Sequence, residues 1–348
     1  MESNKSMLLK KKDGQSFKEK ISNNKKVAII CAMSVILILL IFIFSTVGSV
    51  NLSFNEIILA LIKNDNKVVV TIVYHMRLPR NILAVLVGAS LAVSGCLLQA
   101  VMKNPLADPG ITGVSSGASV FAIFILLLFP KYTAILPMIA FLGGAFACIL
   151  VYLMAWKNGL NPMRVVLAGV AINSILGGVI SLLTTMYSDR IQSALLWLNG
   201  SLASKTWNDT KIIAIYSYSL IGLILSLFCI RGANVLSLGD DTAINLGFNV
   251  AKTRIILSAI SVFLAGTCTA IVGVISFVGL IVPHIGRMII GSDHKYLIPF
   301  SMVLGGSVLL IADTISRTIL GAVELPVGVV MSILGGPFFL YLLKRREK

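Results

Sequence analysis

Charged residues are scarce in this chain of 348 residues. Asp, Glu, Lys and Arg form only 12% of it, against about 25% in soluble domains, and 57% of the residues are hydrophobic. The mean hydropathy is +0.95. These values exclude a water-soluble fold. The even spacing of the apolar stretches predicts one membrane domain, residues 27–348, behind a basic cytoplasmic tail, residues 1–26.

The motifs of nucleotide hydrolysis and of thiol chemistry are also absent. The sequence has no G-x-x-x-x-G-K-S/T loop and no Gly-Lys pair, so it offers no standard cradle for ATP phosphates. Its five cysteines lie in apolar runs and form no CxxC or metal-ligand pattern. We therefore expect no metal and no cofactor on this chain, and we interpret the cysteines as small packing residues.

Acidic residues are particularly few, with 14 Asp and Glu against 29 Lys and Arg, which gives a formal net charge of +15. Such an excess can indicate nucleic-acid binding. Here the basic residues lie in short segments between apolar runs instead of on one polar face. Membrane topology explains them better, so we expect contact with lipid and none with nucleic acid.

Nine apolar stretches are long enough to approach the roughly 20 residues of a spanning helix. Nine spans would place the two basic ends, 10–12 and 344–346, on opposite sides, whereas the positive-inside rule places both in the cytoplasm. The stretch 255–286 would be roughly 48 Å long as one helix, so we divide it near Val272-Gly273. The sequence thus predicts an all-α, polytopic membrane protein with ten transmembrane helices.

The distribution of basic residues agrees with this topology. With ten spans, 20 of the 29 Lys and Arg residues fall on the inner side and the other nine fall outside. The largest inner loop then runs from about 231 to 254, and outer connections lie near 50–80, 187–211 and 318–325.

Two patterns resemble catalytic or metal sites. Gly113–Gly117 matches the G-x-S-x-G nucleophile elbow around Ser115, but it opens a membrane helix, where small residues more often allow close packing. His284, Asp293 and His294 flank an inner turn, yet this spacing forms no standard metal set. We favour helix packing and a capped polar turn, and we expect no catalytic residue.

Three polar segments leave alternatives open. The intramembrane acid Asp313 is either an ion-coupling site of a secondary transporter or the partner of Arg317 four residues on. Arg77 and Arg80 precede the second helix, where cations oppose the macrodipole, so lipid headgroups or an acidic external partner should compensate them. The segment 238–247 predicts a short inner helix that either lies on the membrane or docks a cytoplasmic motor.

Many short motifs together resemble the FecCD-type permeases of ATP-binding cassette (ABC) importers for ferric siderophores, haem and cobalamin. The resemblance covers roughly residues 50–345. The matching stretches are Arg77–Arg80; Gly88 with Ser94-Gly95 and Gln99; Asn104–Gly110; Trp197 with Gly200–Leu202; Leu238–Gly247; Phe277–His284; Glu324–Gly328; and Gly335–Phe339.

This resemblance implies the type II importer permease fold. It also implies a second permease subunit, as a homodimer or a related heterodimer, with the translocation path between the two subunits. Two cytoplasmic ATPase subunits would bind ATP, which fits the missing phosphate loop, and an extracytoplasmic substrate-binding protein would deliver the substrate.

Site residues follow from the same resemblance. Arg77, Arg80 and Arg317 would face outward and pair with acidic residues of the binding protein. The fifth helix would line the path, with the inner gate at Asn161-Pro162-Met163. The helix that couples to the ATPase would comprise Leu238, Gly239, Asp240, Asp241, Ala243, Leu246 and Gly247.

The function that we expect is therefore transport without covalent chemistry. The chain would be the permease subunit of an importer in the cytoplasmic membrane of a bacterium, with both termini cytoplasmic. It would carry an iron(III)-siderophore complex, or a related chelate such as haem or cobalamin, by alternating access. The rival predictions are an ion-driven transporter that uses Asp313 and a membrane enzyme that uses Ser115.

Overall fold

The computed structural model describes residues 22–48, 53, 59, 67–157, 160–203, 206–207, 210–321 and 323–346. Helices dominate this part of the chain, and the only β-type pairing within it is an isolated bridge between Trp156 and Leu160. Most of the basic tail, 1–21, lies outside the described residues.

The α-helices are connected by short 3-10 and π-helical segments. Their bounds are α2 (Asn23–Thr46), α4 (Lys67–Val70), η1 (Thr71–Arg77), α5 (Leu78–Met102), η2 (Pro109–Thr112), α6 (Val114–Leu128), η3 (Pro130–Ile135), α7 (Leu136–Ala155), α8 (Pro162–Met186), η4 (Ser188–Arg190), α9 (Ile191–Leu198), α10 (Thr210–Phe228), α11 (Ile230–Ser237), α12 (Asp240–Asn245), α13 (Val250–Val272), α14 (Val278–Ile290), α15 (His294–Thr318) and α16 (Val327–Arg346).

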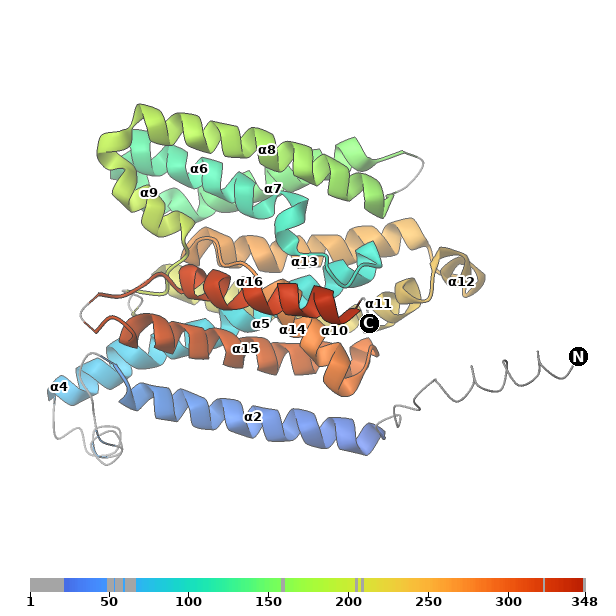
Figure 1. The fold of residues 1–348 in the computed structure, drawn as a ribbon, viewed down its shortest axis with the longest axis horizontal. Coiled ribbons are helices and arrows are strands. Elements are labelled where there is room, and N and C mark those ends of the chain that lie inside the picture. The colour runs from blue at the N-terminus through green and yellow to red at the C-terminus, as the bar shows by residue number, and fades with distance from the viewer. Residues whose placement is uncertain are drawn as a thin grey trace, which may run out of the picture.

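The long helices run side by side along one direction (Figure 1). Six of them are long and apolar enough to cross a membrane, and α10 with α11, bent by 54°, forms a seventh such unit. The helices α6, α14 and α16 are apolar but shorter. The prediction of a helical membrane fold is confirmed, while the count of ten spans stays a prediction.

The apolar stretch 255–286 is interrupted where the sequence predicts. Helix α13 ends at Val272, and Gly273 adopts a φ of 77°, which favours glycine. A Cβ on Gly273 would lie 2.1 Å from the carbonyl oxygen of Trp197, so only glycine fits this crossing. The chain then turns back and α14 begins at Val278.

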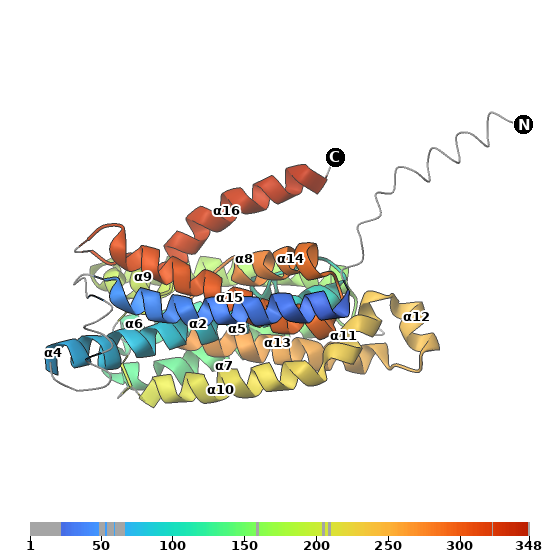
Figure 2. The same ribbon diagram turned by 90° about the horizontal axis from the view of Figure 1, so that it is seen from below.

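Helix α5 lies at the centre of the bundle. Of its 25 residues, 21 are buried, and it packs against α13, α14 and α15. The outer helices are far more exposed: α2 buries only Lys26, Leu37 and Ser45 of its 24 residues, and α8 buries only Val165 and Gly169 of its 25. Figure 2 shows α16 leaning away from the bundle. The fold is therefore a core around α5 with apolar outer surfaces.

Glycine pairs bring α5 into backbone contact with two neighbours. A Cβ on Gly88 would lie 2.2 Å from the carbonyl oxygen of Gly305 in α15, and one on Gly95 would lie 1.9 Å from that of Gly279 in α14. Helices in lipid gain little from hydrophobic contact with one another, so close van der Waals packing at small residues holds them together. These two crossings fix the positions of α14 and α15.

Gly88→Ala should therefore destabilise the protein although alanine is the better helix former. The backbone of α15 must shift to admit the methyl group, and such overpacking typically costs about 1–3 kcal/mol. The matched control is Gly177→Ala in α8, where no atom lies within 4 Å of the added Cβ. It should be neutral or slightly stabilising. Thermal unfolding in detergent measures both, and equal effects of the two would contradict the packing argument.

Candidate functional site

The three predicted docking arginines gather at one end of the bundle, which we call the arginine end. Figure 1 shows α4 at this end and α12 at the opposite one, the α12 end. Arg77 and Arg80 do not begin a helix as the sequence analysis assumed. The π-helical turn η1 joins α4 to α5, so both lie within a helical segment that spans 67–102. The macrodipole argument is therefore wrong for them.

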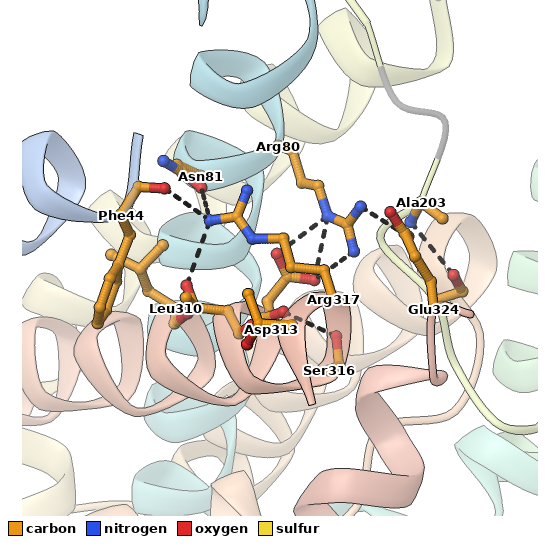
Figure 3. Close-up of polar contacts among 12 residues, drawn as sticks. Phe44, Arg80, Asn81, Ala203, Leu310, Asp313, Ser316, Arg317 and Glu324 are labelled. Carbon is orange, nitrogen blue, oxygen red and sulfur yellow. Dashed lines mark hydrogen bonds and ion pairs between the residues drawn. The ribbon is translucent and has the colours of Figure 1, made fainter. Parts of the chain in front are cut away.

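Arg80 is buried, and its guanidinium forms ion pairs with two carboxylates. Its Nε and Nη2 donate to the carboxylate of Asp313 at 3.0 Å, and its Nη1 donates to Glu324 at 2.8 Å. Figure 3 shows the guanidinium between these two acids. The Asp313 side chain is 0% exposed, whereas that of Glu324 is 46% exposed. Arg80 thus links α5 to α15 through a buried pair and to the α15–α16 loop through a more accessible one.

Arg77 and Arg317 bind the C-terminus of α2. Arg77 donates to the carbonyl oxygens of Ser45 at 2.9 Å and Thr46 at 3.0 Å, and Arg317 donates to that of Phe44 at 2.9 Å. The last carbonyls of a helix lack intrahelical partners and carry a partial negative charge. The two guanidinium groups satisfy both needs, so these cations complement a macrodipole that belongs to another helix.

The partner that the sequence analysis proposed for Asp313 is wrong. Its carboxylate is paired with Arg80, 233 positions away, instead of with Arg317 at i+4. Arg317 donates instead to Phe44, to the Asn81 side chain at 3.1 Å and to Thr314. The Asp313 carboxylate is already engaged in a bidentate contact with Arg80, so this geometry gives no support to Asp313 as an ion-coupling site.

All three arginines line a cavity of about 180 Å³ at this end, together with Gly48, Ile72, Met76 and Glu324. Each arginine residue is at most 8% exposed. Three guanidinium groups line this cavity, and Glu324 is the acid among its described lining residues. The cavity is suited chemically to an additional carboxylate.

At the α12 end, the predicted short inner helix is present. Helix α12 comprises six residues, Asp240–Asn245, between Gly239 with a φ of 114° and Gly247 with a φ of 79°. Leu238 belongs to the end of α11 instead. Two glycines in conformations that other residues rarely adopt therefore bound the helix on both sides.

Asp240 fastens α12 to the bundle. Its carboxylate accepts from Lys103, which ends α5, and from Nη2 of Arg254 in α13 at 2.9 Å. Arg254 also donates to the carbonyl oxygen of Leu160, just before α8. Burial alone would raise the pKa of Asp240, but the bond from Lys103 and the charge of Arg254 outweigh it and hold this pKa below its usual value. One carboxylate thus connects α12 to the end of α5 and to α13.

The side chains of α12 and its flanks divide into a buried and an exposed set. Ala243 is fully buried, whereas Leu238, Ile244 and Leu246 are 63%, 61% and 56% exposed. Ile244 lies in α12 itself, and Leu238 and Leu246 flank it; exposed apolar side chains that gather in this way mark contact with a protein or a membrane. The α12 end therefore carries an apolar surface, held in place by Asp240.

The predicted gate residues begin α8. The Asn161 side chain accepts from the backbone N–H of Met163 at 2.9 Å, and Pro162 occupies the first turn. The Met163 side chain is 67% exposed. These residues form a regular helix start, and no contact distinguishes them as a gate in the described part of the chain.

The remaining motifs have structural roles. Asn234 and Asp293 cap the polar turn before α15, as the sequence analysis favoured. Gly117 packs against Gly143, where an added Cβ would lie 2.3 Å from a carbonyl oxygen. Within the described ranges, no group of three His, Cys, Asp or Glu side chains is placed to hold a metal ion.

Sequence reasoning missed the partners of the predicted site residues. Glu324 was noticed only as part of a motif, and Lys103 and Arg254 were counted only as inner charges. The small number of acidic residues could have indicated these contacts. Few acids occur in the chain, and each one near a membrane segment requires a basic partner. That rule identifies the acids but not which arginine each one meets.

Comparisons with known proteins point to one family. The profile of the FecCD transport family matches residues 36–345. The chain is 38% identical over 328 residues to the heme-iron transport system permease protein IsdF of Staphylococcus aureus strain MSSA476, covering 94% of this chain and 98% of that protein. It is also 38% identical over 316 residues to the Fe(3+)-citrate import system permease protein YfmE of Bacillus subtilis strain 168, covering 90% and 94%.

Solved structures show the same fold. One describes an inward-facing metal-chelate type ABC transporter, with a TM-score of 0.79, 28% identity and coverage of 92% of this chain and 99% of that chain. PsaBC from Streptococcus pneumoniae matches with a TM-score of 0.59 and 16% identity, covering 83% and 95%, a likeness of fold alone. By profile, by identity over nearly its whole length and by fold, this chain belongs to the FecCD transport family and is a permease, a transport component and not an enzyme.

Proposed function

We propose that this chain is the membrane-spanning permease subunit of an ABC importer that carries an iron(III) chelate, such as a ferric siderophore or haem, by alternating access. The observation that carries the proposal is the match to two iron-import permeases over at least 90% of the chain. The importer would contain a second permease subunit, two cytoplasmic ATPase subunits and an extracytoplasmic binding protein. The arginine end would face outward and the α12 end the cytoplasm.

Transport in proteoliposomes tests this proposal directly. The permease would be reconstituted with its ATPase and supplied with its binding protein and either haem or ferric citrate. Uptake of either haem or ferric citrate should require ATP on the side of the membrane where the ATPase subunits lie. Uptake that proceeds without ATP and follows an imposed ion gradient would contradict it.

The arginine end supports a role in docking the binding protein. Three arginines line its cavity, and Glu324, whose side chain is 46% exposed, is bound to Arg80 on the cavity wall. A carboxylate from a partner would meet guanidinium groups already held in position, and such charge-assisted bonds are the stronger kind. Docking would then compete with Glu324 for Arg80.

Removing the Arg80 charge should weaken docking without unfolding the protein, provided that Asp313 is neutralised with it. Arg80→Gln alone leaves a buried carboxylate unpaired, which costs about 3–5 kcal/mol. The double variant Arg80→Gln/Asp313→Asn avoids this penalty. It should bind the binding protein at least about tenfold more weakly, as measured by surface plasmon resonance in nanodiscs.

The matched control for docking is Lys131→Gln, an exposed cation at the same end, which should bind normally. Glu324→Gln adds a test with the opposite sign, because it frees one donor of Arg80 and should strengthen docking. A double variant with normal docking and normal thermal stability would refute the role of Arg80.

The α12 end supports a role in coupling to the ATPase. Helix α12 and the residues that flank it present exposed apolar side chains, and Asp240 fixes α12 to α5 and α13. A partner that moved α12 would therefore pull on two core helices. The segment at 161–163 begins α8 close to this end and would form the inner gate.

Leu246→Asp should insert and fold normally but uncouple the motor, because an exposed side chain that matters only in a complex is being charged. ATP hydrolysis by the assembled importer should no longer respond to the loaded binding protein, and uptake should fall at least about tenfold. Leu246→Met, which keeps the apolar volume, is the control and should transport normally. Unchanged transport in Leu246→Asp would count against the coupling role.

A further inference from the structure

An apolar cavity of about 500 Å³ lies between α7 and α13, and we call it the α7–α13 groove. Its volume falls within the range of about 300–1,000 Å³ that is typical of ligand sites. Residues from 141–156 form one wall and residues from 255–263 form the other. The side-chain oxygens of Tyr152 and Ser258 have almost no accessible surface, so both walls are apolar. None of the roles described above uses this groove.

Small side chains in the middle of both walls create the groove. Ala145 and Cys148 lie in the α7 wall, and Ala259 lies in the α13 wall. Towards the arginine end, Phe141 packs edge-on against Phe263 with ring centroids 6.2 Å apart, so the two helices meet there. The sequence therefore leaves a long hollow that is closed by two rings at one end.

The other end of the groove lies beside Trp156 at the α12 end. Helix α7 stops here, and the backbone of Trp156 pairs with Leu160 in the isolated bridge. Arg254 of α13 donates to the carbonyl oxygen of Leu160 at 3.0 Å, which holds the start of α13 beside the end of α7. Trp156 is 48% exposed, and tryptophan is enriched where the hydrocarbon core meets the headgroups. This end of the groove therefore lies at headgroup level.

Two lysines accompany this end of the groove. Lys157 directly follows Trp156, and Lys252 lies one turn before the lining residue Ile255 on the same face of α13. Both lysines are exposed, and neither forms an ion pair with an acid among the residues that the structure describes. An apolar groove with two cations at its end suits a ligand that has an apolar tail and an anionic head.

The groove has the reach of a lipid chain. Phe141 and Trp156 are 15 positions apart, which corresponds to about 22 Å along a helix and exceeds half of the roughly 30 Å hydrocarbon core. A lipid chain in the bilayer is already out of water, so the groove adds only close packing to its stability. The choice between lipids must therefore come from the headgroup and the two lysines.

We propose that the α7–α13 groove binds an anionic glycerophospholipid from the leaflet that borders the α12 end. One acyl chain lies along the groove, and the phosphate group lies at Lys157 and Lys252. The lysine stems lie on apolar surface while their ammonium groups reach the phosphate, and each lysine near an anionic lipid adds to binding. A zwitterionic lipid has the same chains, but its own cation offsets the phosphate. The inference concerns this chain alone and does not depend on the importer function proposed above.

The position of the groove favours lipid over a second copy of the chain. Figure 2 shows α7 and α10 on the side of the bundle away from α16. Helix α16 leans out of the bundle, so it is the element that a second permease subunit would cover. A subunit seated on α16 would leave the α7–α13 groove facing the bilayer.

Quenching of tryptophan fluorescence by brominated lipids tests the proposal on the full-length permease in nanodiscs. A lipid with brominated chains quenches a tryptophan that it contacts. The chain has three tryptophans, and Trp156→Phe supplies the background from the other two. Brominated phosphatidylglycerol should quench the Trp156 signal with at least about tenfold preference over brominated phosphatidylcholine, because two lysines favour the anionic headgroup.

The headgroup is tested by Lys157→Gln/Lys252→Gln. This double variant should lose the preference for phosphatidylglycerol, while phosphatidylcholine should quench Trp156 as in the wild type. The matched control is Lys25→Gln/Lys295→Gln, which removes two exposed cations from the same end of the bundle. It should keep the preference of the wild type.

The groove itself is tested by Ala259→Phe, whose ring would occupy the space of the lipid chain. Ala259 is exposed, so the variant should fold, and thermal unfolding in detergent checks this. It should abolish the preference at Trp156. Ala32→Phe adds the same ring to an exposed position of α2 and should behave like the wild type.

Three results would overturn the proposal. The first is equal quenching of wild-type Trp156 by the two brominated lipids. The second is a Trp156 that neither lipid quenches, which is the result expected if a second copy of the chain covers the groove. The third is a preference for phosphatidylglycerol that survives in either the lysine double variant or Ala259→Phe.

Discussion

The buried pair between Arg80 and Asp313 is the contact on which the arginine end depends. It joins α5, the central helix, to α15 at a point where the carboxylate is fully shielded from solvent. Moving two charges out of water is unfavourable, so such a pair contributes little net stability but strongly penalises any arrangement that separates it. It therefore acts mainly on register, because only one placement of α15 along α5 brings both groups together.

The glycine crossing between Gly88 and Gly305 and this ion pair join the same two helices, α5 and α15. Gly88 sets how closely α15 approaches α5, and Arg80, eight residues earlier, sets their relative position along the axis. Lys103 lies at the other end of α5 and holds α12 through Asp240. Both functional ends are thus attached to one helix that is buried along most of its length. Because α5 is buried and rigid, it holds the arginine end and the α12 end at a fixed distance from each other. The exposed outer helices remain available for contact with lipid or a second subunit.

The sequence predicted the features that depend on local composition. Apolar length located the membrane helices, and glycine with excess length located the break at Gly273. Glycines on both sides located α12, and Asp240, its first residue, bonds to Lys103 and Arg254. The family motifs identified the three arginines, but these lie inside the bundle and are bonded within the chain.

Long-range pairing was not predictable from a single sequence. Asp313 is four residues from Arg317 and 233 from Arg80, so spacing favoured the wrong partner. The π-helical turn at 71–77 extended the helix past its expected start, and no residue pattern in that turn signals it. The roles of Arg77 and Arg317 depend on where α2 ends, which only the assembled bundle determines.

The C-terminus of α2 determines how easily Arg77 and Arg317 could change their hydrogen-bond acceptors. The last four carbonyls of α2 are all satisfied: Ile43 by the Thr46 hydroxyl, and the next three by Arg77 and Arg317. Carbonyl oxygens carry partial charges, whereas a carboxylate carries a full one. A guanidinium that is bonded to carbonyl oxygens is therefore ordered and shielded from water, but a carboxylate would bind it more strongly than those carbonyls do. Releasing it exposes the end of α2, so the first membrane helix is the element that such an exchange would loosen.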